Sequence, residues 1–582
     1  MKKFLAAALS LVLLGATVPA PMRADDDGGG KAKFKHVLLV SIDGMHAVDY
    51  LNCSQGISGV NGGNPYCPNL AELGENAVNY LETSTSKPSD SFPGLTAIIS
   101  GASPRTAGAF YDVAYDRVLA PPTTDTGNGL SGSGPNGCTR NTPNGTSTEY
   151  EEGIDKNQMY VNGIDGVSTA NGDGGTNSID PLKLPRDPYN NCAPVYPWNF
   201  VRANTIFGVA HTAGLYTAWA DKHPAYSSVN GPGDGTNVDD FFGPEINSTV
   251  TALGVTTVDG VDCSTGLDLN NDITAWTNSF VNIKCYDTLK VNAVKNQIDG
   301  YNHNRSKKAK VPAIFGMNFQ AVSVGQKLIE KDTNGNVTGT GGYLDAAGTP
   351  SAILLSEIAF VDKAIGEWVS ELKKNGLEDS TLVVITAKHG QSPIDSQRYT
   401  RITSSGAVTT SPSRIIDNCL PDSESNAGNQ IGPTEDDISL LWLKKGCDTT
   451  MEVGVLESTS PASANVAGIG QIFYGPSILT SFNKPGIPPN GDSRTPDIIV
   501  TPNVGVTYSK STGKQAEHGG FAHDDTNVIL LVSHPSLDRR TVTSPVETMQ
   551  VAPTILKALG LNPGALDGVK LEGTQALPGL PF

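Results

Sequence analysis

The sequence predicts an α/β fold, a three-layer αβα sandwich with a mostly parallel central sheet and disulfide-stapled cap insertions. Short apolar runs alternate with amphipathic helical segments along the chain. Long segments rich in Gly, Asn, Thr and Pro interrupt this alternation, and they contain the cysteines. With 582 residues, the chain is long enough for one large core that carries insertions.

Six short, β-branched runs have the composition of strands buried on both faces of a parallel sheet. They are residues 36–42, 215–220, 313–317, 381–386, 497–501 and 527–533. Helical patterns cover residues 68–78, 351–374 and 546–559. Pro68 begins the first of these helices, and Gly376 and Gly560 follow the other two, as is typical of helix ends.

The first 24 residues have the features of a secretory signal peptide, with cleavage near 20–24. Lys2 and Lys3 precede an apolar stretch at 4–18, which is shorter than the ~20 residues that span a membrane. We therefore expect a secreted or periplasmic protein without a membrane span in the mature chain. The predicted core, 35–582, is interrupted by insertions at 116–200, 225–300 and 396–480.

The charge balance excludes some partners. Lys and Arg number 41 against 59 Asp and Glu, which gives a formal net charge of −18. So acidic a surface argues against nucleic acid and anionic membranes as partners, whereas a small phosphorylated substrate can still bind a local cationic pocket. The sequence does not indicate the oligomeric state.

Eight cysteines fall into four sequential pairs in loop-rich surroundings, and none forms a CxxC motif. An even number in an exported chain indicates disulfides. The preferred pairing is 53–67, 138–192, 263–285 and 419–447, although spacing leaves other connectivities open.

Five side chains with catalytic chemistry follow predicted strands or lie in turns next to glycines. These are Asp43, Ser91, Lys388, His389 and His518. Ligands of open α/β sheets bind at the carboxyl ends of the strands, so we expect these groups to meet there. Ser91 precedes a short helix at 95–100, where a hydroxyl can act on an anionic group. Asp and His are suitable ligands for a metal that activates such a hydroxyl.

The order of these motifs resembles the alkaline phosphatase superfamily, and within it the type I phosphodiesterase/nucleotide pyrophosphatase family. The motifs are Ser41-Ile42-Asp43-Gly44, Pro68-Asn69-Leu70, Ser91-Phe92-Pro93, His389-Gly390 and His518-Gly519. The resemblance implies a phosphate ester hydrolase that uses zinc or another divalent metal. It places Asp43 and His389 at the metal next to the nucleophile, Ser91 at the nucleophile position and His518 at a second metal.

Three positions depart from the family pattern. Lys388 stands where the family has Asp, and Asn318 and Val322 stand where it has Asp and His. We expect Asn318 to contact substrate, and the Lys388 ammonium to replace part of the metal charge. One ion rather than two then fits the sequence.

Three interpretations stay open: a hydrolase with a reduced metal site, an inactive secreted binding protein of the same fold, and a metal site rebuilt from nearby residues. The candidates for rebuilding are His46, Asp49, Asp90, His523, Asp524 and Asp525. We interpret these six as solvated loop residues. Residues 219–223 follow a strand, and two interpretations stay open for them, a lining of the pocket and the preferred one, a structural turn.

Overall fold

A computed structural model describes residues 33–126, 129–156, 178–246, 255–263, 277–332, 334–402, 411–421, 434–458, 467–509 and 511–582. The predicted signal peptide, 1–24, lies outside these residues. The insertion boundaries predicted at 116–200, 225–300 and 396–480 remain a prediction.

The centre of the molecule is a sheet of eight strands in the order β23-β2-β22-β15-β1-β12-β8-β9. The bounds are β1 His36–Ile42, β2 Ala77–Tyr80, β8 Ala218–Ala220, β9 Asp240–Phe242, β12 Ile314–Phe319, β15 Thr381–Thr386, β22 Leu531–Ser533 and β23 Arg540–Val542. The first strand, β1, runs parallel to both of its neighbours, with Leu39 opposite Gly316 of β12 and Val384 of β15. The mostly parallel sheet predicted from the sequence is confirmed.

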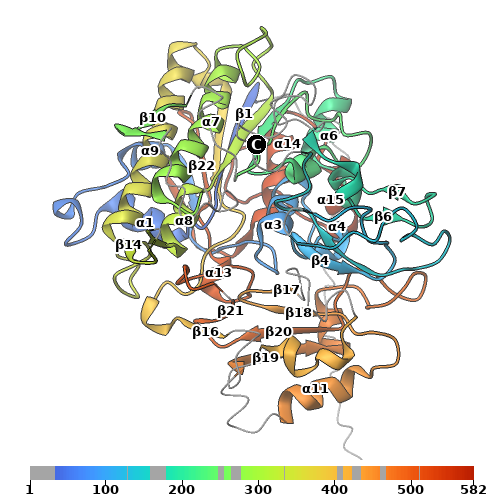
Figure 1. Cartoon of the computed structure of the whole chain (residues 1–582). Coiled ribbons are helices and arrows are strands. Elements are labelled where there is room, and N and C mark those ends of the chain that lie inside the picture. Colours follow the sequence, from blue (N-terminus) through green and yellow to red (C-terminus); the bar gives the residue numbers. More distant parts are fainter. Residues whose placement is uncertain are drawn as a thin grey trace, which may run out of the picture.

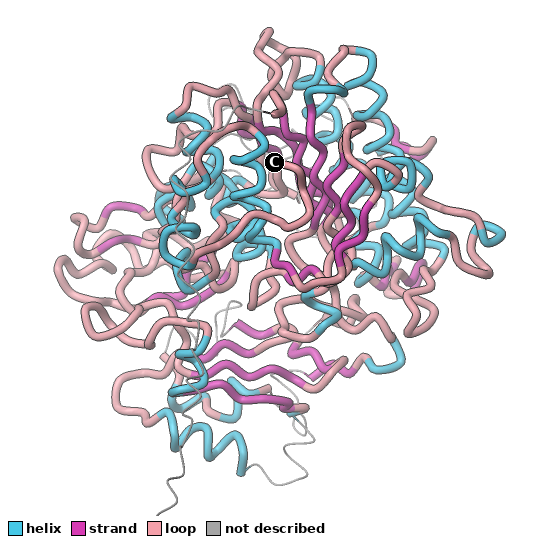
Figure 2. The backbone as a smooth tube through the Cα atoms, turned by 180° about the vertical axis from the view of Figure 1, so that it is seen from behind, coloured by secondary structure: helices cyan, strands magenta, loops and turns pink. Residues whose placement is uncertain are grey.

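Helices cover both faces of this sheet (Figures 1 and 2). One face carries α1 Ala47–Gln55, α2 Pro68–Gly74, α7 Phe280–Ile298, α8 Ala321–Lys327 and α9 Ala352–Lys374. The other carries α3 Ser91–Ser100, α5 Pro197–Phe200, α6 Ile206–Thr212 and α14 Val551–Ala558. Alternate residues of β1 enter the two layers, because Leu38 and Val40 pack in the first core and Val37 and Leu39 in the second.

Two predicted strands differ from the expectation of a parallel sheet. The run at 527–533 forms β22, which is antiparallel to β15 and β2. The run at 497–501 forms β20 Ile498–Pro502, which belongs to a second sheet. An apolar run has the same composition in either setting, so its strand direction and its sheet depend on partners distant in the sequence.

The second sheet has four strands in the order β17-β18-β20-β19 and lies below the central sheet in Figure 1. Its other strands are β17 Thr434–Glu435, β18 Ser439–Leu441 and β19 Ile469–Tyr474. Ile499 of β20 pairs with Leu440 and Phe473 in antiparallel register. This sheet therefore joins the predicted insertion at 396–480 to a strand outside it.

Two predicted helices are shorter than expected. The pattern at 68–78 gives α2 and then β2, which begins at Ala77. The pattern at 546–559 begins with β24 Val546–Glu547 and a 3₁₀ turn before α14. In contrast, α9 and β15 have nearly the predicted bounds.

The predicted disulfide pairing is confirmed at all eight cysteines. The bridges are Cys53–Cys67, Cys138–Cys192, Cys263–Cys285 and Cys419–Cys447. The first three join segments around the central sheet, and Cys419–Cys447 joins segments beside the strands of a second sheet.

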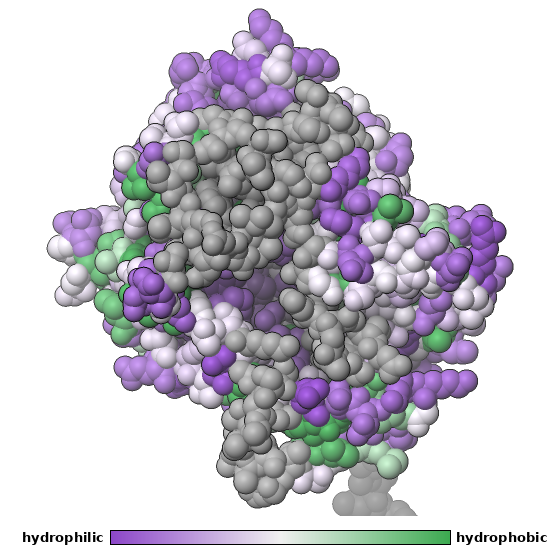
Figure 3. Space-filling view, in the orientation of Figure 1, coloured by the Kyte–Doolittle hydropathy of each residue, from purple (hydrophilic) through white to green (hydrophobic). Residues whose placement is uncertain are grey.

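The face seen in Figure 3 is mostly hydrophilic, with scattered hydrophobic residues, and it is hollowed near its centre. Within the described residues, none of the helices combines the length and the apolar composition that crossing a bilayer requires.

Candidate active site

The candidate site lies at the carboxyl edge of the central sheet. Asp43 follows β1, Lys388 and His389 follow β15, and Asp221 and Lys222 follow β8. Because these strands run in one direction, residues that come directly after them meet at one edge.

The hydroxyl of Ser91 is held at the start of α3. Asp90 is the N-cap of this helix, and its Oδ2 accepts a hydrogen bond from Phe92 N at 2.9 Å. Gly94 lets the helix approach the strand-end loop, since a Cβ there would lie 2.3 Å from the carbonyl oxygen of Lys388. Ser91 is fully buried and is fixed against that loop.

Three polar groups surround Ser91 Oγ. It lies 3.0 Å from His389 Nε2, 3.0 Å from Lys222 Nζ and 3.3 Å from Asp43 Oδ2. His389 Nδ1 lies 2.8 Å from the carbonyl oxygen of Gly390, to which it donates when Nε2 carries the lone pair. The structure therefore brings the predicted residues Asp43, Ser91 and His389 together.

Asp43 is a buried carboxylate with amide donors on both oxygens. Asn318 Nδ2 donates to Oδ1 at 2.7 Å, and Gln320 Nε2 donates to Oδ2 at 2.6 Å. Burial alone would raise the pKa of Asp43, but the charges of Lys388, His389 and Lys222 hold that pKa well below its usual range. Asp43 is thus kept ionised next to the hydroxyl.

Lys388 binds a carboxylate in the wall of the site. Its Nζ lies 2.7 Å from Asp221 Oδ1, both side chains are fully buried, and the ammonium lies 4.0 Å from the ring centroid of Tyr226. Burial lowers the pKa of Lys388 although Asp221 opposes this shift. The ammonium in hydrogen-bond contact with Ser91 is that of Lys222.

Sequence reasoning did not single out Lys222. Of the two interpretations of 219–223, the structure favours the lining of the pocket over the preferred structural turn, because Lys222 Nζ lies 3.0 Å from Ser91 Oγ. Burial would lower the pKa of Lys222, but the carboxyl groups of Asp43, Asp112 and Glu152 raise it. Its position directly after a buried strand was the available signal.

His518 lies on the other side of His389, with ring centroids 4.0 Å apart. Its Nδ1 lies 3.7 Å from Asp90 Oδ1, and neither atom has a hydrogen-bond partner in the described ranges. Burial and the neighbouring His389 hold the pKa of His518 well below its usual range. This imidazole is therefore neutral.

Two of the three residues that differ from the family pattern do not suit the binding of the family's second metal ion. Val322 of α8 is fully buried in the hydrophobic core, and its side chain has no atom that can bind a metal. Asn318 uses its amide group within the protein, since Nδ2 donates to Asp43 and Oδ1 accepts from Gln320 at 2.6 Å. These side chains leave no pair of ligands for an ion at that place.

One ion fits better. Asp43 Oδ2, Ser91 Oγ and His389 Nε2 form a triangle with sides of 3.3, 3.0 and 3.6 Å. Ligands about 2.0–2.2 Å from a tetrahedral zinc lie about 3.3–3.6 Å from one another. Asp43 Oδ2 keeps a second lone pair besides the one that accepts from Gln320. The three atoms therefore have the spacing of ligands to one divalent ion.

Among the described residues, only one group brings three His, Cys, Asp or Glu ligand atoms within 4.8 Å of one another, namely Cys419, Cys447 and Glu452. Two of its members are joined in a disulfide, so their sulfurs are not thiolate ligands.

The six replacement candidates have different surroundings. His46, Asp49, Asp90 and Asp525 are buried, so their interpretation as solvated loop residues is wrong. His46 Nδ1 contacts Asp49 at 3.0 Å and its Nε2 contacts the backbone of Gln391 and Asp524, which occupies both ring nitrogens. His523 is exposed.

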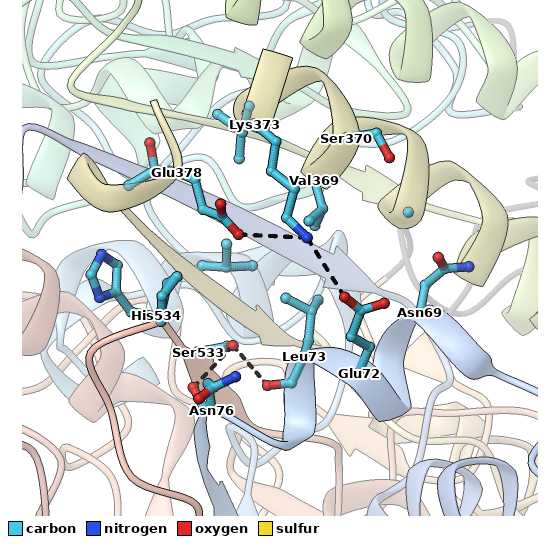
Figure 4. A pocket seen from close by; sticks show the side chains of 15 residues that line it. Asn69, Glu72, Leu73, Asn76, Val369, Ser370, Lys373, Glu378, Ser533 and His534 are labelled. Atoms are coloured by element: carbon cyan, nitrogen blue, oxygen red, sulfur yellow. Dashed lines mark hydrogen bonds and ion pairs between the residues drawn. The ribbon is translucent and has the colours of Figure 1, made fainter. Parts of the chain in front are cut away.

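A separate pocket lies between α2 and α9, where Thr381 begins β15 (Figure 4). Lys373 bridges Glu72 and Glu378 there, at 3.6 Å from each. The candidate site follows the opposite end of β15, so this pocket is distinct from it.

Comparison with known proteins supports the family resemblance over part of the chain. A sequence model of the type I phosphodiesterase / nucleotide pyrophosphatase family matches residues 276–525. The matched part includes Lys388, His389 and His518, whereas Asp43 and Ser91 come from the part of the chain before it.

A solved structure, that of wild-type alkaline phosphatase PafA, shows the same fold at low sequence identity. PafA is 12% identical with a TM-score of 0.51, and the alignment covers 91% of this chain and 96% of PafA. Murine ectonucleotide pyrophosphatase / phosphodiesterase 5 is also similar, 13% identical with a TM-score of 0.49, over 90% of this chain and 95% of that one. No curated protein matches the sequence. The matched family is one of metal-dependent phosphoric ester hydrolases, the enzyme class that the sequence predicts.

Proposed function

We propose that the chain is an exported hydrolase of phosphate esters in which Ser91 is the nucleophile. The observation that carries this proposal is the position of Ser91 Oγ, 3.0 Å from His389 Nε2 and from Lys222 Nζ and 3.3 Å from Asp43 Oδ2. A hydroxyl at a helix start, beside an ammonium and a metal-binding pair, has the surroundings that phosphoryl transfer needs. The predicted signal peptide and the four disulfides support export.

The reaction has two steps. Ser91 Oγ loses its proton and bonds to phosphorus while the bond from phosphorus to the ester oxygen breaks, and the released oxygen takes up that proton through solvent. A water molecule then attacks phosphorus, the bond between phosphorus and Ser91 Oγ breaks, and Ser91 Oγ recovers a proton from the attacking water. The Lys222 ammonium donates to Ser91 Oγ, which stabilises negative charge there before attack and again when the serine is released.

Asp43, Ser91 and His389 are the proposed ligands of one divalent ion, with zinc as the metal that this O and N donor set suits. A bound ion would supply a lower pKa for the Ser91 hydroxyl and polarisation of the phosphoryl group. The amides of Asn318 and Gln320 orient the Asp43 carboxylate. We propose a positioning role for Asn318, because both ends of its amide are bonded within the protein.

The charges around Ser91 also support a bound cation. Burial above all raises the pKa of Asp90 to about 6. Burial, together with the negative charge of the neighbouring Asp90, raises the pKa of Asp112 to about 8. Lys222 is the ammonium beside Ser91, because Lys388 is paired with Asp221. A phosphate anion binds such carboxyl-rich surroundings well only when added positive charge offsets them.

The test is turnover of nitrophenyl phosphate, bis(nitrophenyl) phosphate and nitrophenyl sulfate by the mature protein. We expect hydrolysis of at least one phosphate ester and a lower rate on the sulfate. Removal of metal with a chelator should reduce the rate at least about tenfold, and zinc should restore it. The ratio of the two phosphate rates distinguishes a phosphatase from a phosphodiesterase, and no turnover of either ester contradicts the proposal.

Replacement of Lys222 by methionine should reduce kcat/KM about 100-fold or more, because the loss of one charged donor at a developing anion typically costs that much. The measurement is steady-state kinetics on the best phosphate ester. Lys373→Met is the matched control and should leave kcat/KM within twofold. Lys373 is in α9 and lines the separate pocket at the start of β15. Equal effects of the two substitutions would contradict a role for Lys222.

A second candidate function is supported by Val322, Asn318 and Lys388, which replace three family ligands. A protein with these substitutions can bind a phosphorylated molecule without turning it over. Retained binding of phosphate with no turnover of any ester would favour this inactive binding protein over the hydrolase.

A further inference from the structure

Asp90 carries an unsatisfied oxygen next to the nucleophile. Its Oδ2 accepts from Phe92 N at 2.9 Å and from Asp112 N at 3.0 Å, which fixes the carboxylate. Its Oδ1 is fully buried and has no hydrogen-bond partner among the residues that the structure describes. A buried carboxylate oxygen without a donor is costly, so its retention here needs an explanation.

The atom that faces this oxygen is unsatisfied as well. His518 Nδ1 lies 3.7 Å from Asp90 Oδ1, is buried and has no hydrogen-bond partner within the described part of the chain. Gly519 N donates to Ser89 Oγ at 3.3 Å, which ties the His518 segment to the turn before Asp90. A separation of 3.7 Å is too long for a hydrogen bond and lies just above the spacing of about 3.3–3.6 Å between two ligands on one zinc ion.

We propose that Asp90 Oδ1 and His518 Nδ1 bind a second divalent cation of the zinc type. Asp90 then supplies the carboxylate that Asn318 no longer offers, from the turn that carries the nucleophile rather than from β12. Water and a phosphoryl oxygen would complete the coordination. This inference rests on the proposed function and deepens it, because the ligand Asp90 directly precedes the nucleophile Ser91.

The residues around this place are compatible with a cation. Asp112 adds a carboxyl group, and its own N–H holds Asp90. Lys388 contributes little repulsion because it is paired with Asp221 at 2.7 Å. Three further ammonium groups act on His518, those of Lys222, Lys327 and Lys514. Lys222 directs its Nζ to Ser91 Oγ at 3.0 Å, and the Glu517 carboxylate offsets the other two, since it is paired with Lys514 and is also near Lys327. The two hydrogen bonds to Asp90 Oδ2 also hold Oδ1 of the same carboxylate in place to bind a metal ion.

The experiment measures bound zinc per chain after dialysis, by mass spectrometry of the metal, in full-length mature protein. We expect two ions in the wild type, one in Asp90→Asn, one in Asp43→Asn and none in the double variant. Asparagine is also a good N-cap, so Asp90→Asn preserves α3. His518→Gln provides a second variant and should also bind one ion.

Equal zinc content in the wild type and in Asp90→Asn would overturn the inference. So would a single ion in the wild type that Asp43→Asn removes, although that result leaves the proposed hydrolase intact. A wild type with two ions but no ester turnover would reject the proposed function and retain the second site. Zinc-dependent stabilisation against heat, smaller in Asp90→Asn than in the wild type, gives a further measure that is independent of activity.

Discussion

Replacement of Ser91 by alanine is expected to lower kcat/KM for phosphate esters at least about a thousandfold. The groups that contact Ser91 Oγ are a histidine, an ammonium and a carboxylate, and none of them offers a second hydroxyl that could replace the nucleophile. Steady-state kinetics measures the loss, and trapping at low pH followed by peptide mass analysis should find phosphate on Ser91 only in the wild type.

Ser100→Ala is the matched control for this experiment. Ser100 is the last residue of the same helix, and its hydroxyl donates to the carbonyl oxygen of Thr96 at 2.6 Å. The helix separates the two hydroxyls by about 13 Å, so Ser100→Ala should keep activity within a few-fold. If Ser91→Ala keeps wild-type turnover, Ser91 is not the nucleophile.

Replacement of Lys388 by methionine should lower the free energy of unfolding by about 3–5 kcal/mol. Lys388 Nζ and Asp221 Oδ1 are 2.7 Å apart, and both side chains are fully buried. Removal of the ammonium leaves the Asp221 carboxylate with only Trp219 Nε1 and the Lys222 N–H as donors. Urea unfolding followed by fluorescence measures the change.

Two variants isolate the cause of this destabilisation. Lys373→Met removes a half-exposed ammonium with ion pairs of 3.6 Å and should cost less than about 1 kcal/mol. Asp221→Asn combined with Lys388→Met should recover about 1–3 kcal/mol of the loss, because no buried charge is then left alone. A cost below about 1 kcal/mol for Lys388→Met would mean that the pair contributes little to folding.

The parts of the fold that the sequence predicts well are those with a strong local pattern. The β-branched run of β15 and the amphipathic repeat of α9 give their bounds closely, because hydrophobic period and helix-end residues act locally. Strand direction is different. β22 is antiparallel and β20 lies in a second sheet, since pairing depends on which distant strand is available.

The same distinction applies to the site. Asp43 and His389 follow strands at the edge where ligands bind, so their meeting with Ser91 follows from topology. The direction in which a long side chain points does not follow from the topology. Lys222 and Lys388 both follow strands of this edge, yet Lys222 bonds to Ser91 and Lys388 bonds to Asp221. The choice depends on where buried carboxylates lie, which one sequence does not reveal.

All four sulfur bridges close segments of 14 to 54 residues, and none has an end in the central sheet. The strands that carry Asp43, Lys222 and His389 are held by backbone pairing and side-chain packing alone. Reduction of the cystines is therefore expected to loosen the segments that they close, whereas the arrangement of the reactive groups at the sheet edge depends on no sulfur bond.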